Sequence, residues 1–392
     1  MSVSEDERIA RATLLHISEP ANSALIDHVD RVGAVQAVDD IRRGASIEGV
    51  DIDGLRHRLQ ATSGAADIER AARCGARLVC PGDEEWPAPL DDLGWVGRAS
   101  FGLWVCGPLS LVEATATSVA MVGTRTATDY GASVAADMAF ELAERDWSVV
   151  SGLAFGIDTA AHRGVLSAGG TTIGVLACGI DVPYPKSNRP LYDRLASEGL
   201  VVSEHPPGSA PQRYRFLVRN RIIAALSLGT VVVEMALRSG ARSTASHAAA
   251  INRHVMCVPG PITSTMSGGC HRLLRERPET VLVTSAAEVV EQCGHMGDLA
   301  ERESGPARTR DLLGPMVARV FEGVPVQRHA NVAGIANSAG VSVPVAAAAL
   351  AALASAGLVE CVGDRWAMTT EGRRDRRSRT GAGVDQLELD WW

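Results

Sequence analysis

The spacing of hydrophobic residues divides the chain into three regions with different secondary structure. Residues 5–75 carry apolar side chains at intervals of three and four, as in Ala10 and Leu14, and contain no run typical of a strand. We therefore expect residues 1–75 to form an all-helical domain, SAM-like or helix-hairpin-helix-like. Residues 17–20 lack the Gly-x-Gly hairpin with which helix-hairpin-helix modules contact phosphate. DNA contact is accordingly not the favoured role of this region.

Residues 76–297 alternate short β-rich runs with amphipathic helical segments. In residues 131–144, for example, Ala135, Met138 and Leu142 fall on one helical face. Strand–helix alternation of this length is typical of a parallel sheet with helices on both faces. We predict an α/β fold, a Rossmann-like doubly wound parallel sheet. The predicted strands are residues 77–80, 103–106, 118–122, 148–151, 172–177, 200–203, 230–234, 254–258 and 281–284.

The last third of the chain has the pattern of a separate small domain. Residues 298–308 are charged and contain Gly and Pro, which predicts a linker. The elements predicted after it are helices at 312–320, 330–338 and 343–355, then a β-hairpin at 357–368 with its turn at Gly363-Asp364. This order predicts a winged-helix domain over 309–372 and a flexible tail over 373–392. The third helix has almost no polar side chain to present to base edges, which favours a structural or protein-contact role.

The composition indicates a well-packed globular protein without a general attraction for nucleic acid. Hydrophobic residues make up 46% of the 392 residues and charged residues 21%. The 38 Lys and Arg residues against 46 Asp and Glu give a net charge of −8. Binding of nucleic acid would therefore need a local cationic patch. Lys186 is the only lysine, so anion contacts are expected to come from arginine.

The sequence gives no sign of secretion, membrane insertion or a metal site. The N-terminus, MSVSEDERIA, is polar and acidic, and no apolar run reaches the length of a membrane span. The eight cysteines are scattered, without a Cys-x-x-Cys pair. We expect a cytoplasmic protein with reduced thiols, no membrane contact, no metal and no other cofactor.

Glycine-containing loops follow several of the predicted strands. Gly123, Thr124 and Arg125 follow the strand at 118–122 and lead into a helix, whose N-terminal N–H groups together with the arginine fork could bind an anion. The loop lacks the G-x-G-x-x-G fingerprint, which counts against NAD. A second loop, with Gly152 and Gly156, is also expected to let its amides approach a phosphate.

The residues that follow Gly156 have plainer interpretations. Asp158 lies near a predicted helix start and is more simply a capping residue than a catalytic one. His162 lies one turn further on, where local packing is favoured over a ligand-binding role. A third Gly/Ser loop contains Ser239 and Gly240 and leads to Thr244 in the next helix.

The segment 213–223 is the most informative stretch of the chain. It places arginines, two aromatic side chains and an asparagine at one helix start within an acidic protein, namely Arg213, Tyr214, Arg215, Phe216, Arg219, Asn220 and Arg221. Guanidinium groups for phosphate and rings for bases are what a groove for single-stranded nucleic acid needs. A surface helix laced by salt bridges is the alternative. No arrangement in the chain offers an activated nucleophile or paired carboxylates, so the residues favour binding over turnover.

Five motifs follow one another along the chain, namely VGTRTATDYG, SGLAFGIDTAAH, RNRII, VVEMALRSGARSTA and VPGPITSTMSGGCHRLL. In this order and spacing they resemble the motifs of the DNA-processing protein A family, also called DprA or Smf. The chain resembles this family strongly over residues 77–292. The helical head and the C-terminal region match its three-part layout more loosely.

The resemblance implies a function and a set of site residues. Members of the family bind single-stranded DNA cooperatively, protect it from nucleases and load the RecA recombinase during natural transformation and recombination. They have no established catalytic activity and form homodimers through the Rossmann-like domain. By motif match, the residues expected to contact DNA are Gly123, Thr124, Arg125, Gly152, Gly156, Phe216, Arg219, Asn220, Arg221, Ser239, Gly240 and Thr244.

Two departures and two alternatives accompany this interpretation. Leu217 stands where the family commonly has Pro, and His271 where it commonly has Asn. The fold also resembles that of lysine-decarboxylase-like phosphoribohydrolases, but the stretch from Ser227 to Glu234 keeps Gly229-Thr230 and an acid while it loses the preceding glycines. The second alternative is a scaffold whose winged helix binds a partner and whose cleft is vestigial.

Overall fold

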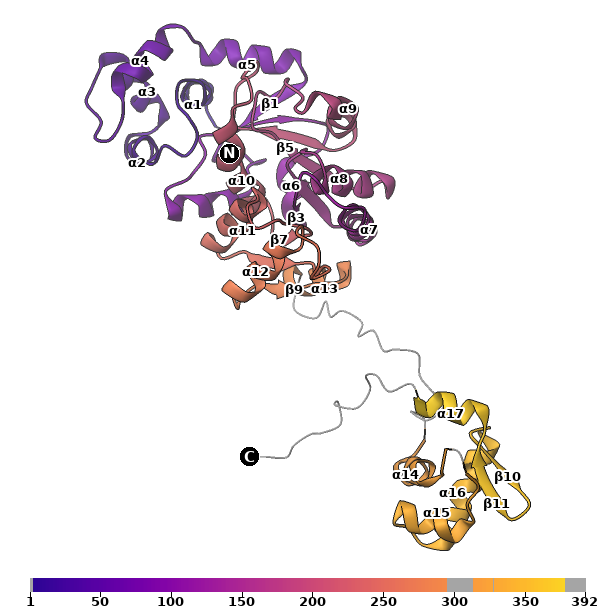
Figure 1. The fold of residues 1–392 in the computed structure, drawn as a ribbon. Coiled ribbons are helices and arrows are strands. Elements are labelled where there is room, and N and C mark those ends of the chain that lie inside the picture. Colours follow the sequence, from indigo (N-terminus) through magenta and orange to yellow (C-terminus); the bar gives the residue numbers. More distant parts are fainter. Residues whose placement is uncertain (1–2, 295–312, 327, 378–392) are drawn as a thin grey trace. The chain divides into compact units, whose positions relative to one another are not determined.

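The computed structural model describes residues 3–294, 313–326 and 328–377. The chain divides into two compact units, the first reaching to Glu301 and the second beginning at Arg302. Each unit has its own hydrophobic core. The linker predicted at 298–308 lies outside the described residues (Figure 1).

A nine-stranded sheet organises the first unit, and all nine predicted strands are present. Its order is β1-β2-β6-β5-β4-β3-β7-β8-β9. Strands β3 to β9 run parallel, whereas β1 and β2 form an antiparallel edge beside β6. The strands are β1 Ala76–Val79, β2 Leu103–Cys106, β3 Ser118–Val122, β4 Ser148–Ser151, β5 Thr172–Val175, β6 Leu200–Ser203, β7 Gly229–Val232, β8 His254–Cys257 and β9 Val281–Leu282. The α/β prediction is confirmed, with the antiparallel edge as an addition.

The strand order reverses direction between β3 and β7. From β3 the chain adds β4, β5 and β6 on one side and then returns to place β7, β8 and β9 on the other. Loops at the carboxyl ends of β3 and β7 therefore diverge and leave a crevice, which is where open α/β sheets bind ligands. The predicted loops at Gly123 and at Ser239 follow these two strands.

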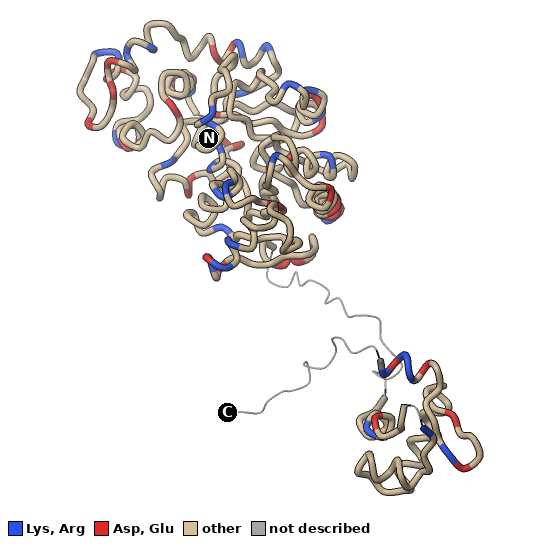
Figure 2. Tube along the Cα trace, viewed as in Figure 1, with Lys and Arg blue, Asp and Glu red and all other residues tan. Residues whose placement is uncertain are grey.

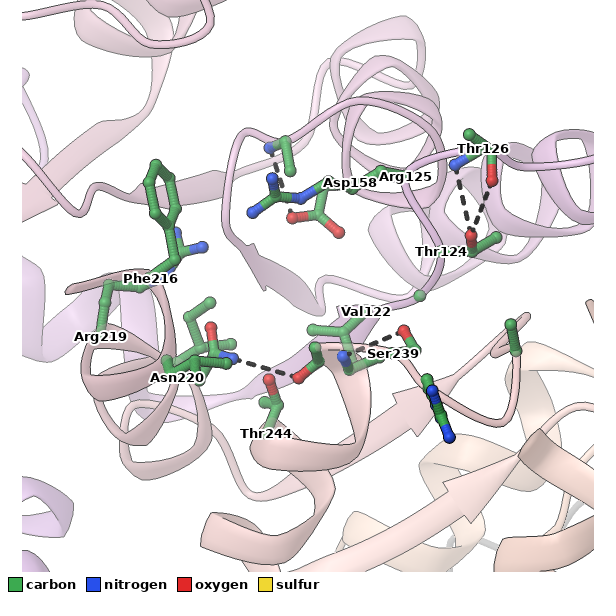
Figure 3. Close-up of a pocket in the computed structure, with 18 of the residues that line it drawn as sticks. Val122, Thr124, Arg125, Thr126, Asp158, Phe216, Arg219, Asn220, Ser239 and Thr244 are labelled. Atoms are coloured by element: carbon green, nitrogen blue, oxygen red, sulfur yellow. Dashed lines mark hydrogen bonds between the residues drawn. The ribbon is translucent and has the colours of Figure 1, made fainter. Parts of the chain in front are cut away.

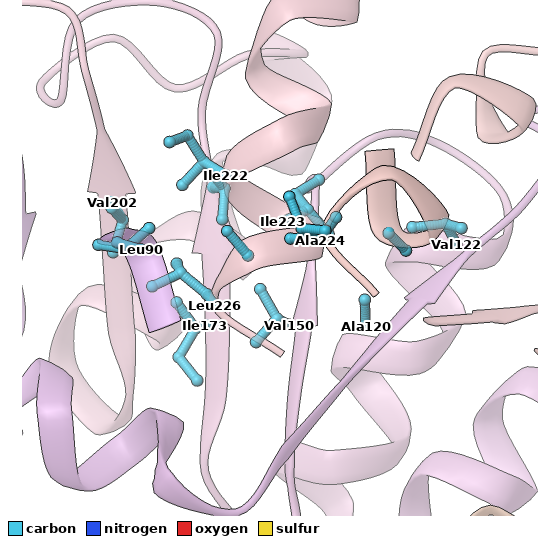
Figure 4. Close-up of a cluster of buried hydrophobic side chains, with 14 of the residues drawn as sticks. Leu90, Ala120, Val122, Val150, Ile173, Val202, Ile222, Ile223, Ala224 and Leu226 are labelled. Carbon is cyan, nitrogen blue, oxygen red and sulfur yellow. The ribbon is translucent and has the colours of Figure 1, made fainter. Parts of the chain in front are cut away.

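Helices cover both faces of the sheet because successive strand residues point to opposite sides. In β3, Ala120 and Val122 join one core, while Val119 and Met121 join the other. Figure 4 shows the first of these cores, in which residues of α10 pack on β3, β4, β5 and β6. The helices of this part are η1 Ala88–Val96, α6 Leu111–Ala116, α7 Asp129–Glu144, α8 Ile157–Ser167, η2 Lys186–Asn188, α9 Arg189–Glu198, α10 Arg213–Ala225, α11 Ala241–Ala250, α12 Gly268–Glu276 and α13 Ala286–Cys293.

The N-terminal region is all-helical, as its periodicity predicts, and packs directly on the antiparallel edge of the sheet. Its helices are α1 Glu5–Ile17, α2 Ser23–Val32, α3 Ala34–Arg43, α4 Ile52–Gln60 and α5 Gly64–Arg73. Their apolar faces share one buried cluster with Leu78 and Trp104 of β1 and β2. Arg8 also makes a two-pronged ion pair with Asp83, with N···O distances of 2.8 and 2.7 Å. The helical head and the sheet thus have a continuous core.

The second unit contains the expected three helices and hairpin. Its elements are α14 Pro315–Gly323, α15 Val332–Ala339, α16 Val343–Ser355, β10 Val359–Val362, β11 Arg365–Met368 and α17 Thr370–Arg377. Strands β10 and β11 pair antiparallel, and Gly363 at their turn has φ +69°. The assignment as a winged helix stays a prediction.

The predicted flexible tail is wrong at its beginning. Residues up to Arg377 form α17, because Arg373 donates to the carbonyl of Met368 and Arg376 donates to the carbonyl of Val324 at 2.6 Å. Residues 378–392 lie outside the described part of the chain. Within the described ranges no single helix has the length and hydropathy to cross a membrane; α15 and α16 reach them only as a pair, across a bend of 102°.

Candidate functional site

A cavity of about 830 Å³ lies where β3 and β7 end. The loop after β3, the first turns of α10 and the loop that leads into α11 form its walls. Figure 3 shows Phe216, Arg219 and Asn220 on one side of this space and Thr124 on the other. The crevice implied by the strand order therefore exists as a cavity.

The cavity brings together nine of the twelve residues that the sequence predicts for the site. They come from three segments that are far apart in the chain, and they are Gly123, Thr124, Arg125, Phe216, Arg219, Asn220, Ser239, Gly240 and Thr244. The amide of Asn220 donates to the carbonyl of Gly240 at 3.3 Å and ties α10 to the loop before α11. The structure thus confirms the convergence of these segments, while the DNA-binding role of the residues stays a prediction.

Three exposed arginines give the cavity its cationic character. Arg125, Arg213 and Arg238 line it, and no ion pair among the described residues includes any of them. Basic and acidic positions are otherwise interspersed along the first unit (Figure 2). The site therefore carries local positive charge in an acidic protein, which is the condition that the composition sets for binding an anionic polymer.

An aromatic pair stands beside these arginines. The guanidinium carbon of Arg125 lies 5.1 Å from the ring centre of Phe216, within the range of a cation–π contact. The ring of Tyr184 lies 5.4 Å from that of Phe216, at an interplanar angle of 49°. Tyr184 is 41% exposed, so an apolar ring is available to a flat ligand at the mouth of the cavity.

Arg219 forms the floor of the cavity and has a structural task there. It is buried, and its Nη1 donates to the carbonyls of Gly152, at 3.0 Å, and Val175. Burial lowers the pKa of its guanidinium to about 10, which leaves it charged at neutral pH. Arg219 therefore contributes a fixed charge and not a side chain that swings toward a ligand.

Asp158 is the carboxyl group of the cavity wall, and it braces a loop. Its Oδ2 accepts the N–H groups of Gly152 at 3.1 Å and Ala154 at 3.4 Å. Burial raises the pKa of this carboxyl group, and the nearby Arg219 opposes the rise. Asp158 thus holds the loop before α8 and is not the N-cap residue of that helix, which is Gly156.

The expectation that Gly152 and Gly156 contact a ligand is not supported by their positions. Neither lines the cavity. A Cβ at Gly152 would lie 2.4 Å from a terminal nitrogen of Arg219, and a Cβ at Gly156 would lie 2.3 Å from the carbonyl oxygen of Thr124. These glycines are needed because other parts of the site pass so close to the backbone.

Arg221 is the clearest error among the predicted site residues. It is 1% exposed, does not line the cavity, and donates from both terminal nitrogens to the carboxylate of Glu204, at 2.7 Å for the Nη2–Oε1 pair. Arg215 likewise donates to Glu19 of the helical head, at 2.6 and 3.0 Å. For these two arginines the alternative of structural salt bridges is correct.

The helix that follows Gly123 does not offer its N-terminus to a ligand. Glu234, which is buried at the end of β7, accepts the N–H of Thr128 at 3.0 Å and the hydroxyl of Thr128 at 2.6 Å. The hydroxyl of Thr128 in turn accepts the N–H of Gly131. The N–H of Thr124 is also used, because it donates to the carbonyl of Glu234 at 2.7 Å. The first turn of α7 and the N–H of Thr124 are therefore not available to an anion in the cavity, whereas the guanidinium groups are.

The two histidines named in the sequence have local partners. His162 is fully buried and its Nδ1 lies 2.7 Å from the hydroxyl of Thr172, in agreement with a packing role. His271 has its Nε2 3.0 Å from the carbonyl oxygen of Gly260. Within the described residues no group of three or more His, Cys, Asp and Glu side chains is placed to hold a metal ion.

Sequence reasoning missed several residues that line the cavity. Arg238 lies just before the predicted Ser239-Gly240 loop, and Tyr184 lies in a loop beyond β5. Leu217, the residue that replaces the common Pro, lies inside α10 and is exposed toward the cavity. The sequence could have indicated Arg238, because it lies in the same loop as Ser239 and Gly240. For Tyr184 the sequence offers only an aromatic residue after a predicted strand, which is weak evidence for a binding site.

Comparisons with known proteins agree on one family. A profile of the DNA recombination-mediator protein A family matches residues 77–294. A Mycobacterium tuberculosis protein that carries the DprA name is 43% identical over 372 residues, which is 93% of this chain and 95% of that protein. The X-ray structure of DNA processing protein A from Streptococcus pneumoniae superimposes with a TM-score of 0.63 at 29% identity, covering 76% of this chain and 100% of that one. The chain therefore belongs to the DNA recombination-mediator protein A, or DprA, family.

Proposed function

We propose that the cavity binds single-stranded DNA. The observation that carries this proposal is the combination, at one cavity, of an accessible aromatic pair and three exposed arginines for which the described part of the chain provides no carboxylate partner. Guanidinium groups pair with phosphates, and Phe216 and Tyr184 offer rings on which an unpaired base stacks. In a duplex the bases are stacked on each other and paired, so the rings would have no base to bind.

The wider role follows from the family. We propose that the protein shields single-stranded DNA and delivers it to the RecA recombinase during DNA uptake, transformation and recombination. Formation of a homodimer through the Rossmann-like sheet belongs to the same proposal. What supports it is the match to a family of recombination mediators together with a cavity suited to the DNA strand.

The alternative of a phosphoribohydrolase is disfavoured by the carboxyl groups. Glu234, the acid in the comparable stretch, is 1% exposed and has both oxygens bonded to Thr128. Asp158 is buried and accepts two backbone N–H groups. Neither is placed as a free acid or base toward a glycosidic bond. Release of free base from nucleoside monophosphates by the purified protein would contradict this part of the proposal.

Substitution of Arg125 tests the proposed function. Arg125→Ala should weaken binding of a thymidine oligonucleotide by about 1–3 kcal/mol, the scale of a charge-assisted hydrogen bond. It should also reduce the slope of log K against log salt by about 0.7, the loss of one phosphate contact on a single strand. The thermal midpoint should change little, because Arg125 is exposed and its substitution removes only the cation–π contact with Phe216. Fluorescence anisotropy across a salt series measures both quantities.

The control is Arg145→Ala, which removes an exposed arginine at the C-terminal end of α7. Arg145 comes just before β4 begins and so lies near the amino ends of the strands, whereas the cavity lies at their carboxyl ends. This variant should bind as the wild type does. Duplex DNA of equal length should bind more weakly than the single strand. If the triple variant Arg125→Ala, Arg213→Ala, Arg238→Ala binds single strands with unchanged affinity, the cavity is not the interface and the scaffold alternative is favoured.

A further inference from the structure

A second aromatic and arginine pair lies outside the cavity, at the end of η1. Trp95 is 76% exposed, whereas Trp86, Trp104 and Trp147 are each less than 10% exposed. Arg98 follows it by three residues, is exposed, and forms no ion pair with a carboxylate in the described part of the chain. An indole this exposed is unusual, because tryptophan side chains are mostly buried or anchored in interfaces.

Direct contacts connect Arg98 to the wall of the cavity. Its Nη1 lies 2.8 Å from Nδ1 of His247 on α11. The ring of His247 is also hydrogen-bonded to the backbone of Leu217. Leu217 lines the cavity, as does Thr244, which lies one helical turn before His247. Arg98 is therefore one side chain away from the cavity rim.

The charge on His247 fixes the direction of these hydrogen bonds. Burial, followed by the positive charge of Arg98, lowers the pKa of His247 to about 4. At neutral pH the ring is therefore uncharged, so its Nδ1 accepts from Arg98 and its Nε2 carries the ring proton. This anchor uses one N–H group of Arg98, and no carboxylate of residues 3–294 forms an ion pair with it.

One of the two carboxylates of η1 is neutralised. The carboxylate of Asp92 lies 2.5 Å from Arg253, whereas Asp91 accepts the indole N–H of Trp86 at 2.8 Å and keeps its negative charge. The pairing of Asp92 removes one repulsive charge from the approach of a phosphate to Arg98. An exposed indole three residues before a guanidinium that has no carboxylate partner among the described residues fits a nucleotide, whereas a protein partner would need a broader apolar patch.

We infer that the DNA strand continues from the cavity over His247 to a second contact, in which Arg98 binds a phosphate and Trp95 stacks on a base. This inference rests on the proposed function and extends it to a longer strand. It predicts that short and long strands of single-stranded DNA make different contacts. A strand that fills only the cavity does not reach Trp95, and a longer strand does.

Oligonucleotide length separates the two contacts. Trp95→Ala and Arg98→Gln should each weaken binding of an oligothymidine of about twenty nucleotides roughly ten-fold, and leave binding of one of about six nucleotides unchanged. Trp95→Tyr should bind like the wild type, because it keeps an aromatic face. The long strand should quench tryptophan fluorescence in the wild type and not in Trp95→Ala, and the short one should quench neither. Arg145→Ala serves as the charge control.

Each outcome decides between this inference and its alternatives. If the wild type binds the long strand and both variants bind it equally well, the second contact is refuted and the cavity remains the site. If Trp95→Ala instead changes only the sedimentation of the protein, the surface belongs to a protein interface and the inference is wrong. If the wild type binds neither strand, both this inference and the proposed function fail.

Discussion

Arginines around α10 differ in what surrounds their guanidinium groups, and that difference separates structural from binding residues. Arg219 and Arg221 are buried and bonded to carbonyls and a carboxylate, respectively. Arg125 and Arg213 are exposed and unpaired within the described residues. A buried guanidinium must have acceptors because its desolvation is otherwise too costly. The exposed ones keep their N–H groups for an anion.

The buried pair of Arg221 and Glu204 leads to a stability prediction. Arg221→Ala leaves the Glu204 carboxylate buried without a partner, and it should destabilise the fold by about 3–5 kcal/mol. The double variant Arg221→Met, Glu204→Leu should recover most of this loss, because neither charge remains. Urea unfolding at pH 7 measures both.

The same variants show whether Arg221 takes part in binding. At a temperature where the double variant is folded, its affinity for oligothymidine should equal that of the wild type, since Arg221 does not line the cavity. A loss of affinity at unchanged stability would instead place Arg221 in the DNA interface.

At the scale of elements, the loops that follow β3 and β4 hold each other in place. The N–H of Ile157 donates to the carbonyl of Thr124 at 3.2 Å. Gly156 has φ +76°, and a Cβ there would lie 2.3 Å from that carbonyl oxygen and 2.8 Å from the carbonyl group of Arg125. The position of Arg125 therefore depends on a residue that does not touch the cavity.

Gly156→Ala tests this dependence. The added methyl group should both strain a positive φ and push the Thr124-Arg125 backbone away, so we expect lower thermal stability and at least several-fold weaker binding of oligothymidine. Gly169→Ala is the matched control, because Gly169 has φ +71° but nothing within 4 Å of its Cβ position. It should cost about 1 kcal/mol in stability and leave the affinity unchanged. Equal effects of the two variants on affinity would refute the coupling of the loops.

Local pattern predicts the elements of this protein well and their long-range partners poorly. The buried strands could be identified because each is a short apolar run between helical segments, and the three walls of the cavity followed from the loops after them. The predictions that were wrong concern side chains whose partners are distant in the sequence. Glu204 neutralises Arg221, Glu19 neutralises Arg215, and Glu234 occupies the start of α7. Nothing near these arginines or this helix in the sequence shows which carboxylate will reach them.

At the scale of the first unit, two buried histidines in separate places link stability to pH. His162 lies on the buried face of α8 and His205 lies between the sheet and the helical head, and both are less than 5% exposed. Burial, with a smaller effect of Arg219, lowers the pKa of His162 to about 3. Burial, with Arg215 next, lowers the pKa of His205 to about 4. Both rings stay neutral in the folded protein at pH values where the unfolded chain is protonated.

This difference predicts a loss of stability in mild acid. With the folded pKa values below the unfolded value of about 6.5, the unfolded chain binds more protons as the pH falls below 6.5, so the free energy of unfolding decreases. Each histidine should account for on the order of 2 kcal/mol between pH 7.5 and pH 5. Glu19 and Asp83 titrate below this pH range. Burial raises the pKa of each carboxyl group, but its interactions, chiefly with the arginine partner, lower it by more, so that the net pKa is below the ordinary value. Their stabilising contribution is lost only at lower pH.

Urea unfolding at pH 7.5, 6 and 5 measures the effect in the wild type and in the variant His162→Gln, His205→Gln. The variant should be less stable at pH 7.5, since a buried glutamine replaces each packed ring, but its stability should fall less steeply toward pH 5. The slope that remains includes the contribution of His247, whose pKa is also lowered to about 4. His57→Gln removes an exposed histidine and should keep the steep wild-type profile. Parallel profiles for the wild type and the double variant would show that other groups cause the acid sensitivity. A flatter profile in the double variant alone would assign it to the two buried rings, because glutamine cannot take up the proton that the unfolded histidine does.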